Sequence, residues 1–514
     1  MNALLEQALA APFGTITGLI QLHAEQAPQR RALAQDGQSL TYAELDARMD
    51  RVAAALQRDG VLPGEAIAIC AGTSIAYAVT YLGALRAGVV VAPLAPGSTA
   101  ESLAGMLHDA GAKLLFTDRS VAELLGDQAA AVPRVALDDA AAGRPWTLWL
   151  AVPGRRPQPV QLGAQWPFNI IYSSGTTGHP KGIVQPHGMR WAHVQRGATY
   201  GYGADTVTLL STPLYSNTTL VVFFPTLAYG GTVLLMARFD AAAYLTLAAQ
   251  ERVTHTMLVP VQYQRLMARP DFGGHDLSRF RMKFSTSAPF SAALKADVLE
   301  RWPGGLVEFY GMTEGGGTCI LEAHLHPDKL HTVGQPAQGH DIRLIDEAGQ
   351  EVSAGEAGEV VGHSPGMMKG YHQQPEKTRE AEWFDLQGKR FIRTGDVGRF
   401  DAEGFLVLFD RRKDMIISGG FNIYPSDLET VLRQHPAVHD VAVVGVPSEQ
   451  WGETPVAFVV RQPGQDLAAE ALKSWANGRV GKTQRLADLR YIAELPRSAI
   501  GKVLKRELRE MYRA

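Results

Sequence analysis

A loop of hydroxyls and glycines that ends in Lys181 is the segment of this chain best suited to chemistry. Glycine lets backbone N–H groups approach a ligand, Ser and Thr add short donors, and the lysine adds positive charge, so the loop could surround phosphate oxygens. It is not a Walker A loop, because that motif needs Ser or Thr after the lysine and Gly182 stands there. A plain turn is the alternative. The candidate phosphate-binding residues are Ser173, Ser174, Gly175, Thr176, Thr177, Gly178 and Lys181.

A second candidate segment begins at Tyr310 and contains Thr313 and Glu314, followed by three glycines. An aromatic ring, a hydroxyl and a carboxylate suit a purine, a phosphate and a divalent cation, respectively. Mg²⁺ binds through one or two carboxylates plus substrate phosphates, so Glu314 alone would be enough. The preceding apolar run places the segment at the end of a strand. A glycine-rich turn with incidental charges is the alternative.

Three more segments contain residues that could bind a nucleotide or an anion. Asp396 follows Gly395, and an Asp just after a tight turn can accept hydrogen bonds from ribose hydroxyls or simply form the turn. Residues 410–425 join a cluster of charges to the pair Gly419-Gly420, a composition that also fits a domain linker. Lys502 lies near the C-terminus, where a lone lysine is usually a solubility residue.

Length and composition limit the class of protein. A chain of 514 residues is too long to fold around one hydrophobic core, so we expect two or more domains. A net charge of −3 without a long basic run argues against nucleic acid as a partner. Two cysteines exclude a disulfide framework and fit a reducing, cytoplasmic location. The N-terminus lacks the basic region of a signal peptide, and no apolar stretch approaches the ~20 residues of a membrane span.

The order of periodic segments predicts an α/β fold with mostly parallel sheets. Helical spacing covers 41–58, with Thr41 and Glu44 as a capping pair, and 76–86. Apolar strands are expected at 64–71, 88–93, 114–118, 206–212, 232–236 and 255–260. From about residue 334 a β-rich subdomain is expected, with strands in 341–346, 358–363 and 391–411. We expect an N-terminal domain of 1–411 and a small α+β C-terminal domain of 412–514.

Taken together, these segments resemble the adenylate-forming family of acyl-CoA synthetases, aryl-CoA ligases, luciferases and peptide-synthetase adenylation domains. The resemblance extends from about Leu40 to Leu508. Residues 411–429 (RRKDMIISGGFNIYPSDLE) and 496–508 (PRSAIGKVLKREL) are most similar to the acyl- and aryl-CoA ligase branch. It implies that a carboxylic acid and ATP give an acyl-adenylate and pyrophosphate, and that CoA then displaces AMP.

The resemblance assigns a role to each segment. The loop ending at Lys181 would hold the β- and γ-phosphates, and Lys502 would bridge the acyl carboxylate and the α-phosphate. Converging cations and a metal would provide most of the catalysis, because adenylation joins two anions. The remaining contacts implied are Tyr310 at adenine, Thr313 at the α-phosphate, Glu314 at Mg²⁺, Asp396 at the ribose hydroxyls and Arg411 at the ribose or phosphate. Gly311 is also implied as a nucleotide-binding residue.

The same family implies a moving C-terminal domain with its hinge at Lys413. In one orientation Lys502 would enter the active site. In the other, Gly419 and Gly420 would line the pantetheine tunnel. Trp451 matches a position that contacts the CoA nucleotide in some aryl-CoA ligases, and an anchor in the core of the small domain is the alternative.

The chain departs from the family pattern at the acyl pocket. Ser216 stands where His is usual, and amino-acid-activating relatives have Asp there, so an ammonium substrate would lack its carboxylate partner. Asp410 also replaces a common Gly, and residues 481–484 replace the usual Lys-x-Pro. We expect an uncharged aryl, aryl-alkenyl or medium-chain fatty acid. The candidate pocket residues are Tyr215, Ser216, Asn217, Val261, Ala288, Gly315 and Gly316.

Four other functions compete with a CoA ligase. An acyl-AMP ligase that loads a carrier protein would use the same glycines. A regulator without catalysis should lack Lys502, Glu314 or Lys181, and all three are present. A P-loop kinase or ATPase would need the missing Walker A pattern. Luciferase-type oxidation needs the same adenylation step. The expected partners are ATP, Mg²⁺, CoA and a carboxylic acid, with the chain a monomer or homodimer.

Overall fold

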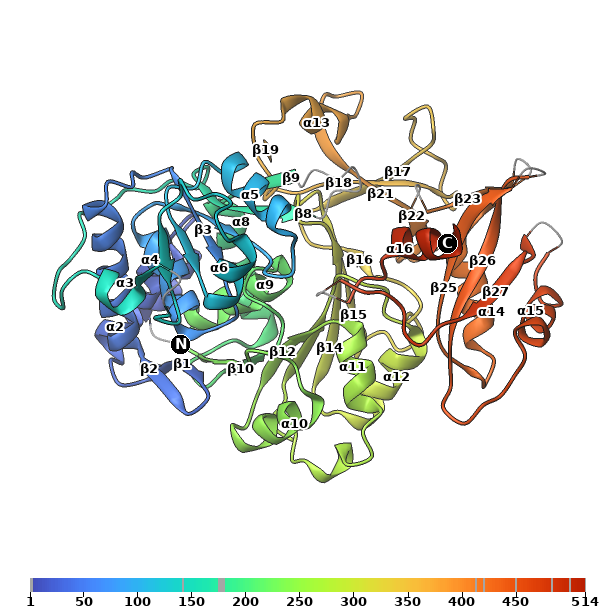
Figure 1. Cartoon of the computed structure of the whole chain (residues 1–514), viewed down its shortest axis with the longest axis horizontal. Coiled ribbons are helices and arrows are strands. Elements are labelled where there is room, and N and C mark those ends of the chain that lie inside the picture. The colour runs from blue at the N-terminus through green and yellow to red at the C-terminus, as the bar shows by residue number, and fades with distance from the viewer. Residues whose placement is uncertain are drawn as a thin grey trace. The chain divides into compact units, whose positions relative to one another are not determined.

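The structure is a computed structural model that describes residues 3–140, 143–173, 181–411, 414–418, 421–448, 451–481, 484–498 and 501–513. Its strands form four sheets within these ranges (Figure 1). The chain divides into two compact units. The first comprises residues 1–330, 336–341 and 363–392, and the second comprises 331–335, 342–362 and 393–514.

The first sheet is parallel through its centre and antiparallel at its ends. Strands β1, β10, β11, β12, β13 and β14 pair in parallel, while β2 and β15 pair antiparallel with their neighbours. Its order is β16 (Gln335–Pro336), β15 (Thr318–Glu322), β14 (Gly305–Gly311), β13 (Met282–Ser285), β12 (His255–Leu258), β10 (Val207–Leu210), β11 (Thr232–Leu235), β1 (Arg31–Gln35) and β2 (Gln38–Thr41).

The second sheet holds the strands that flank the phosphate-loop segment. Strands β8 and β9 pair antiparallel next to a parallel set, because a short connection can join only antiparallel neighbours. Its order is β19 (Gly370–Tyr371), β9 (Lys181–Pro186), β8 (Pro167–Ser173), β4 (Val90–Pro93), β3 (Ala66–Cys70), β5 (Leu115–Thr117), β6 (Arg134–Ala136) and β7 (Arg144–Pro145).

Helices cover these sheets and bury one large apolar core. Helix α3 packs on α2 and α4, and α9 packs on α2 and α8. The helices of the first unit are α1 (Ala3–Ala10), α2 (Ile16–Gln26), α3 (Tyr42–Arg58), α4 (Ile75–Arg86), α5 (Ala100–Asp109), α6 (Arg119–Leu125), α7 (Trp146–Trp149), α8 (His187–Arg196), α9 (Asn217–Ala228), α10 (Ala241–Gln250), α11 (Pro260–Met267), α12 (Ala292–Arg301) and α13 (Pro375–Glu380), with 3₁₀ turns at Gly197–Tyr200 and Phe272–Gly274.

The C-terminal half contains two smaller sheets. The β-rich segment has the order β17 (Asp341–Ile345), β18 (Gly358–His363), β21 (Arg390–Phe400) and β20 (Glu382–Phe384), with β22 (Leu406–Arg411) paired to β21. The last sheet has the order β24 (Phe421–Ile423), β23 (Ile416–Ser418), β26 (Gly452–Arg461) and β25 (Val438–Ser448), with β27 (Asp488–Tyr491) paired to β26. Helices α14 (Pro425–Arg433), α15 (Ala469–Asn477) and α16 (Lys505–Arg513) accompany it.

The expected α/β fold is confirmed. Helix α3 begins with a complete capping box, in which the Thr41 hydroxyl accepts from the Glu44 N–H and the Glu44 carboxylate accepts from the Thr41 N–H. Each apolar run that we expected to form a strand contains a strand in the structure. None of the helices in the described part of the chain combines the length and apolar character needed to cross a bilayer.

Candidate active site

Lys181 and Glu314 are brought together around Tyr371. Lys181 begins β9, Glu314 lies in the turn after β14, and Tyr371 ends β19. The Tyr371 hydroxyl donates to Glu314 Oε1 at 2.9 Å, and Lys181 Nζ lies 4.9 Å from the centre of the Tyr371 ring. The cluster therefore places a cation, a phenol and a carboxylate on the second sheet and the end of the first, where charged phosphates could meet them.

Tyr371 is fixed by its strand. It pairs with Ile183 of β9, and its N–H donates to Thr378 Oγ1 at 2.9 Å. Burial raises the pKa of Tyr371, and the neighbouring Glu314 carboxylate raises it further. The phenol therefore keeps its proton and acts as a donor to Glu314. Sequence reasoning missed Tyr371, because a single aromatic residue after Lys369-Gly370 has no distinguishing pattern.

The turn that presents Glu314 is held by the segment 364–368. The Met368 N–H donates to the Glu314 carbonyl at 2.7 Å, and the Ser364 hydroxyl donates to the Gly315 carbonyl at 2.6 Å. Gly315 has a φ of +72°, and a Cβ there would lie 2.6 Å from the Gly366 carbonyl oxygen. The backbone thus requires glycine at this position, apart from any contact with an acyl group.

Thr313 is tied to the acyl motif by Gln185. The Gln185 side-chain amide donates to the Thr313 carbonyl at 2.7 Å and lies 3.5 Å from Asn217 Oδ1. Its amide oxygen accepts from Arg190, a fully buried guanidinium beside the rings of Phe168 and Phe224. Burial lowers the pKa of Arg190 to about 10, which leaves it charged at neutral pH. Gln185 was also missed, since it lies in an ordinary strand pattern.

The segment with Tyr310 and Gly311 ends β14, as predicted. The buried carboxylate of Glu308 pairs with Lys295 of α12, whose Nζ also donates to the Leu330 carbonyl at 2.8 Å. Tyr310 itself is half-buried. The ion pair anchors the strand from which the adenine candidate projects.

Asp396 and Arg411 face each other across β21 and β22 as direct backbone partners. The expectation of a tight turn at Asp396 was wrong. Residues 393–396 lie inside β21, and Gly395 with a φ of +72° marks the point where β21 changes partner from β20 to β22. β20 pairs with β21 up to Ile392 and β22 pairs with it from Asp396, so the glycine bends a strand that continues and does not end it.

Three of the acyl-pocket candidates, Tyr215, Ser216 and Asn217, lie at the start of α9. Ser216 caps this helix, accepting from the Thr218 N–H at 3.3 Å, and Asn217 is its first residue. The Thr218 and Ser287 hydroxyls are 2.6 Å apart, which links α9 to the segment that contains Ala288. Tyr215, Val261 and Ala288 are each half-buried, and Gly316 is buried.

Lys502 is exposed, in a hairpin just before α16. Its carbonyl accepts from the Ser498 N–H at 2.8 Å. Trp451 is 51% exposed in the turn between β25 and β26, so it is not an anchor in the core of the small domain. Ser174, Gly175, Thr176, Thr177, Gly178, Lys413, Gly419 and Gly420 lie outside the described residues, as do the side chains of Ser173 and Arg411.

Two family models match most of this chain. Residues 20–372 match the model described as AMP-binding enzyme, and residues 427–502 match the AMP-binding enzyme C-terminal domain. The chain is a member of the AMP-binding enzyme family. Within that family it belongs with the adenylate-forming acyl- and aryl-CoA ligases, which are acid–thiol ligases.

Similar proteins align with this AMP-binding enzyme over nearly their whole length. A feruloyl-CoA synthase from Amycolatopsis sp is 35% identical over 501 residues, covering 95% of this chain and 97% of that protein. A fatty acid–[acyl-carrier-protein] ligase, ScoC, from Streptomyces coeruleorubidus is 30% identical, and the alignment covers 97% of this chain and 96% of that protein. The crystal structure of ATP-bound MatB from Rhodopseudomonas palustris superimposes with a TM-score of 0.87 at 30% identity, covering 97% and 99%.

Proposed function

We propose that this protein is an AMP-forming acyl-CoA synthetase that acts on an uncharged aryl or medium-chain fatty acid. ATP and the acid give an acyl-adenylate and pyrophosphate, and the CoA thiol then displaces AMP. The observation that supports this most is the cluster of Lys181, Tyr371 and Glu314 beside a Thr313 fixed by Gln185. It places the cation proposed for the phosphates near the carboxylate proposed for the metal, in a chain that matches both family models.

In the first step the acid carboxylate attacks the α-phosphorus and pyrophosphate leaves. Lys181 neutralises charge on the leaving pyrophosphate, Thr313 binds the α-phosphate, and Lys502 bridges the two reacting anions. Glu314 would hold Mg²⁺, which would supply further positive charge to the phosphates. A lone carboxylate fits this ion, because Mg²⁺ in such sites takes most of its other ligands from phosphates and water.

The rest of the nucleotide is assigned to residues from several elements. Tyr310 stacks on adenine beside Gly311, and Asp396 and Arg411 bind the ribose, consistent with their opposite positions on β21 and β22. The loop residues complete the phosphate site: Ser173, Ser174, Gly175, Thr176, Thr177 and Gly178.

The start of α9 supports an uncharged acyl group. Ser216, at the position where amino-acid-activating relatives have Asp, is buried and caps the helix. An ammonium there would be left without a carboxylate partner. Helix α9 continues with Phe223 and Phe224, whose rings are fully buried in the apolar core and hold the helix in place. The pocket would also include Tyr215, Asn217, Val261, Ala288, Gly315 and Gly316.

For the second step we propose that a C-terminal domain of 412–514 turns about Lys413 relative to the domain of 1–411. Gly419 and Gly420 would then line the pantetheine path, and Trp451 would contact the CoA nucleotide. The exposure of the Trp451 ring is consistent with a ligand contact. The cytoplasm, where ATP and CoA are available, is the proposed location.

A carrier-protein ligase is the second candidate, because the similar protein ScoC is named as one. Both acceptors present the same pantetheine thiol, so the first step and its residues would be unchanged. Only the acceptor of the acyl group would differ.

The proposal is tested by pyrophosphate release with ATP and Mg²⁺ over a panel of carboxylic acids, with and without CoA. We expect acid-dependent release, stimulated by CoA, for aryl and medium-chain acids. Lys502→Ala should reduce it by about 10²- to 10³-fold, as expected for loss of one preorganised charge. Turnover with dicarboxylic acids alone would contradict the substrate class, and transfer to a carrier protein but not to CoA would favour the second candidate.

A further inference from the structure

We propose that Arg497 and Asp440, together with Lys505 and Glu429, are positioning residues that hold the Lys502 hairpin for adenylation. The Lys502 hairpin is defined here as the described residues of 496–504. This inference rests on the proposed function, in which Lys502 acts only in the first half-reaction. All residues involved lie in the second compact unit.

The hairpin is held together by short-range contacts. The Leu504 N–H donates to the Pro496 carbonyl and the Ser498 N–H to the Lys502 carbonyl, both at 2.8 Å. Arg497 and Val503 form an antiparallel bridge between its two arms. Lys502 N–H donates to Ser498 Oγ at 3.2 Å. These contacts set the shape of the hairpin, but a two-stranded hairpin by itself is marginally stable in water.

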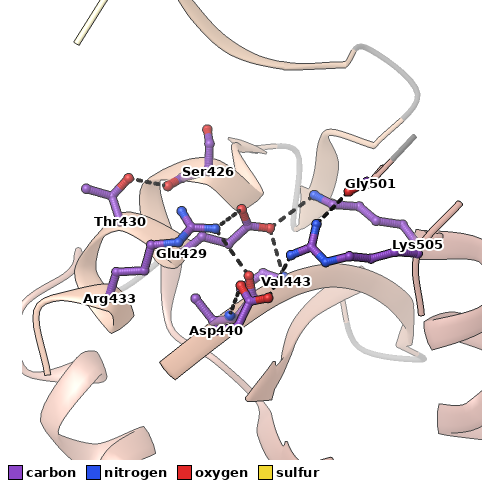
Figure 2. A network of polar contacts seen from close by, with 10 residues as sticks. Ser426, Glu429, Thr430, Arg433, Asp440, Val443, Gly501 and Lys505 are labelled. Atoms are coloured by element: carbon purple, nitrogen blue, oxygen red, sulfur yellow. Dashed lines mark hydrogen bonds and ion pairs between the residues drawn. The ribbon is translucent and has the colours of Figure 1, made fainter. Parts of the chain in front are cut away.

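Arg497 joins the hairpin to the sheet through Gly501 and Asp440, both of which are labelled in Figure 2. Its Nη1 donates to the Gly501 carbonyl at 2.7 Å, directly before Lys502, and its Nη2 donates to Asp440 Oδ2 at 2.6 Å. The other Asp440 oxygen accepts from the Val441 N–H at 2.9 Å, which orients the carboxylate on β25. A guanidinium can make both bonds at fixed angles, whereas a lysine ammonium has no such planar fork.

The second arm is anchored through Glu429 of α14 (Figure 2). Lys505, three residues after Lys502, places its Nζ 3.2 Å from Glu429 Oε1, which also accepts from the Val443 N–H at 2.9 Å. Arg433 Nη2 lies 3.4 Å from the other oxygen of the same carboxylate and donates to the Val441 carbonyl at 3.2 Å. Burial alone would raise the pKa of Glu429, but the neighbouring charges, Lys505 first, lower it overall.

The two ion pairs therefore flank Lys502 in the sequence, with Arg497 before it and Lys505 after it. The side chains of Arg497 and Asp440 are 25% and 20% exposed, and those of Lys505 and Glu429 are 17% and 13% exposed. Solvent screening weakens the interaction energy of such partly buried ion pairs less than that of a fully exposed pair. Lys502 is exposed and has a long, flexible side chain. The position of its backbone therefore determines which points its ammonium group can reach.

The experiment separates the two half-reactions in the full-length enzyme. Arg497→Gln and the isosteric Asp440→Asn are assayed for acid-dependent pyrophosphate release, and then for thioester formation from a supplied acyl-adenylate and CoA. We expect pyrophosphate release to fall by about 10²-fold, the cost of misplacing a catalytic group by about 1 Å, with thioester formation unchanged. The double variant should be no slower than the slower single variant, because both remove one interaction.

The matched control is Arg461→Gln, which breaks an ion pair of the same domain with Asp466 (3.5 Å). It should leave both half-reactions unchanged. Equal losses in the two half-reactions for Arg497→Gln, or additive losses in the double variant, would overturn the proposal by indicating a general structural role. Unchanged pyrophosphate release would overturn it as well.

Hydrogen exchange gives a readout that does not depend on activity. In Arg497→Gln, amide exchange should rise in the peptide that spans 496–504 and stay unchanged in the rest of the small domain. Unaltered exchange there would overturn the proposal even in an active enzyme. Failure of the proposed function can be told apart from failure of this inference. If the proposed function is wrong, the wild-type protein releases no pyrophosphate, and the hydrogen-exchange result still tests whether Arg497 holds the hairpin.

Discussion

At the residue scale, the chemistry depends on which donors and charges surround Glu314. Tyr371 gives this carboxylate one hydrogen bond and places its ring beneath Lys181. The phenol separates the ammonium from the carboxylate, so neither charge is neutralised by direct pairing with the other across that ring. Both remain available to phosphates and a metal ion, which is what an adenylating site needs.

Tyr371→Phe tests this arrangement. The ring beneath Lys181 stays, but Glu314 loses a donor whose bond to a charged group is worth about 1.5 to 3 kcal/mol. We expect kcat/KM for MgATP to fall by at least about tenfold, with a larger requirement for free Mg²⁺. Steady-state pyrophosphate release at varied ATP and Mg²⁺ measures both.

Tyr244→Phe is the matched control for that substitution. Its hydroxyl is also buried and donates to Thr256 Oγ1 at 2.7 Å, in a strand and helix without a proposed catalytic residue. It should lower stability by a similar amount and leave MgATP kinetics unchanged. An equal kinetic effect in both variants would contradict the role assigned to Tyr371.

Residue types predicted part of this cluster and could not predict the rest. Lys181, Thr313 and Glu314 stand in segments dense in glycines and hydroxyls, a composition that ordinary core strands avoid. Tyr371 and Gln185 stand in short apolar strands and act through neighbours more than fifty residues away in sequence. Only the tertiary fold, in which the turn after β14 meets β9 and β19, brings such residues into contact with the motifs.

At the element scale, the turn after β14 is held by segment 364–368 in addition to its own hydrogen bonds. The bonds to the carbonyls of Glu314 and Gly315 come from Met368 and Ser364, which lie between β18 and β19. The backbone at residue 315 lies so close to the Gly366 carbonyl that a side chain larger than that of glycine would collide with it. Segment 364–368 therefore helps to fix the turn that presents Glu314.

Gly315→Ala should expose that dependence. The φ of +72° and the contact at 2.6 Å add strain of about 3 kcal/mol, and the turn must move away from Gly366. We expect a lower free energy of unfolding together with a loss of pyrophosphate release, both measured on purified protein.

Gly201→Ala provides the comparison, because Gly201 has a φ of +70° and nothing within 4 Å of its added Cβ. Gly201→Ala should lower the free energy of unfolding by about 1 kcal/mol, because alanine is strained at this φ, and it should leave activity unchanged. If Gly315→Ala were no more harmful than Gly201→Ala, the close approach to Gly366 would not constrain the turn.

Elements were easier to predict than their pairing. The helix 42–58 and the buried strands follow from local periodicity and caps, which is information contained within each segment. The segment 393–396 has the composition of a turn, yet it lies within β21, because β20 pairs with this strand up to Ile392 and β22 pairs with it from Asp396. Gly395 keeps its left-handed φ of +72°, and the pairing before and after it makes it a bend within a strand.

At the scale of the whole molecule, buried histidines make the first compact unit sensitive to acid. Burial lowers the pKa of His187, His255 and His340 to about 4 each. An unfolded chain takes up these protons near pH 6.5, whereas the folded chain resists them until about pH 4. Stability is therefore full above pH 6.5 and falls as pH decreases from 6.5 towards 4.

His187→Phe should relieve part of this sensitivity. The substitution keeps an aromatic ring against Phe168, 4.8 Å away, and removes the titrating group. Between pH 7 and pH 5 we expect it to lose about 2 kcal/mol less unfolding free energy than the wild type, from a single lowered histidine pKa. Chemical unfolding at both pH values measures the difference, and parallel losses in the two proteins would contradict a neutral, buried His187.

The most direct test of the central claim follows the oxygen of the acid. With an accepted acid labelled with ¹⁸O at both carboxylate oxygens, an adenylate mechanism forms a bond from that oxygen to the α-phosphorus and breaks the acyl C–O bond when the thiol attacks. Mass spectrometry should then find one ¹⁸O in the AMP, alongside the acyl-CoA thioester. Unlabelled AMP, or ADP as the nucleotide product, would contradict the proposed function.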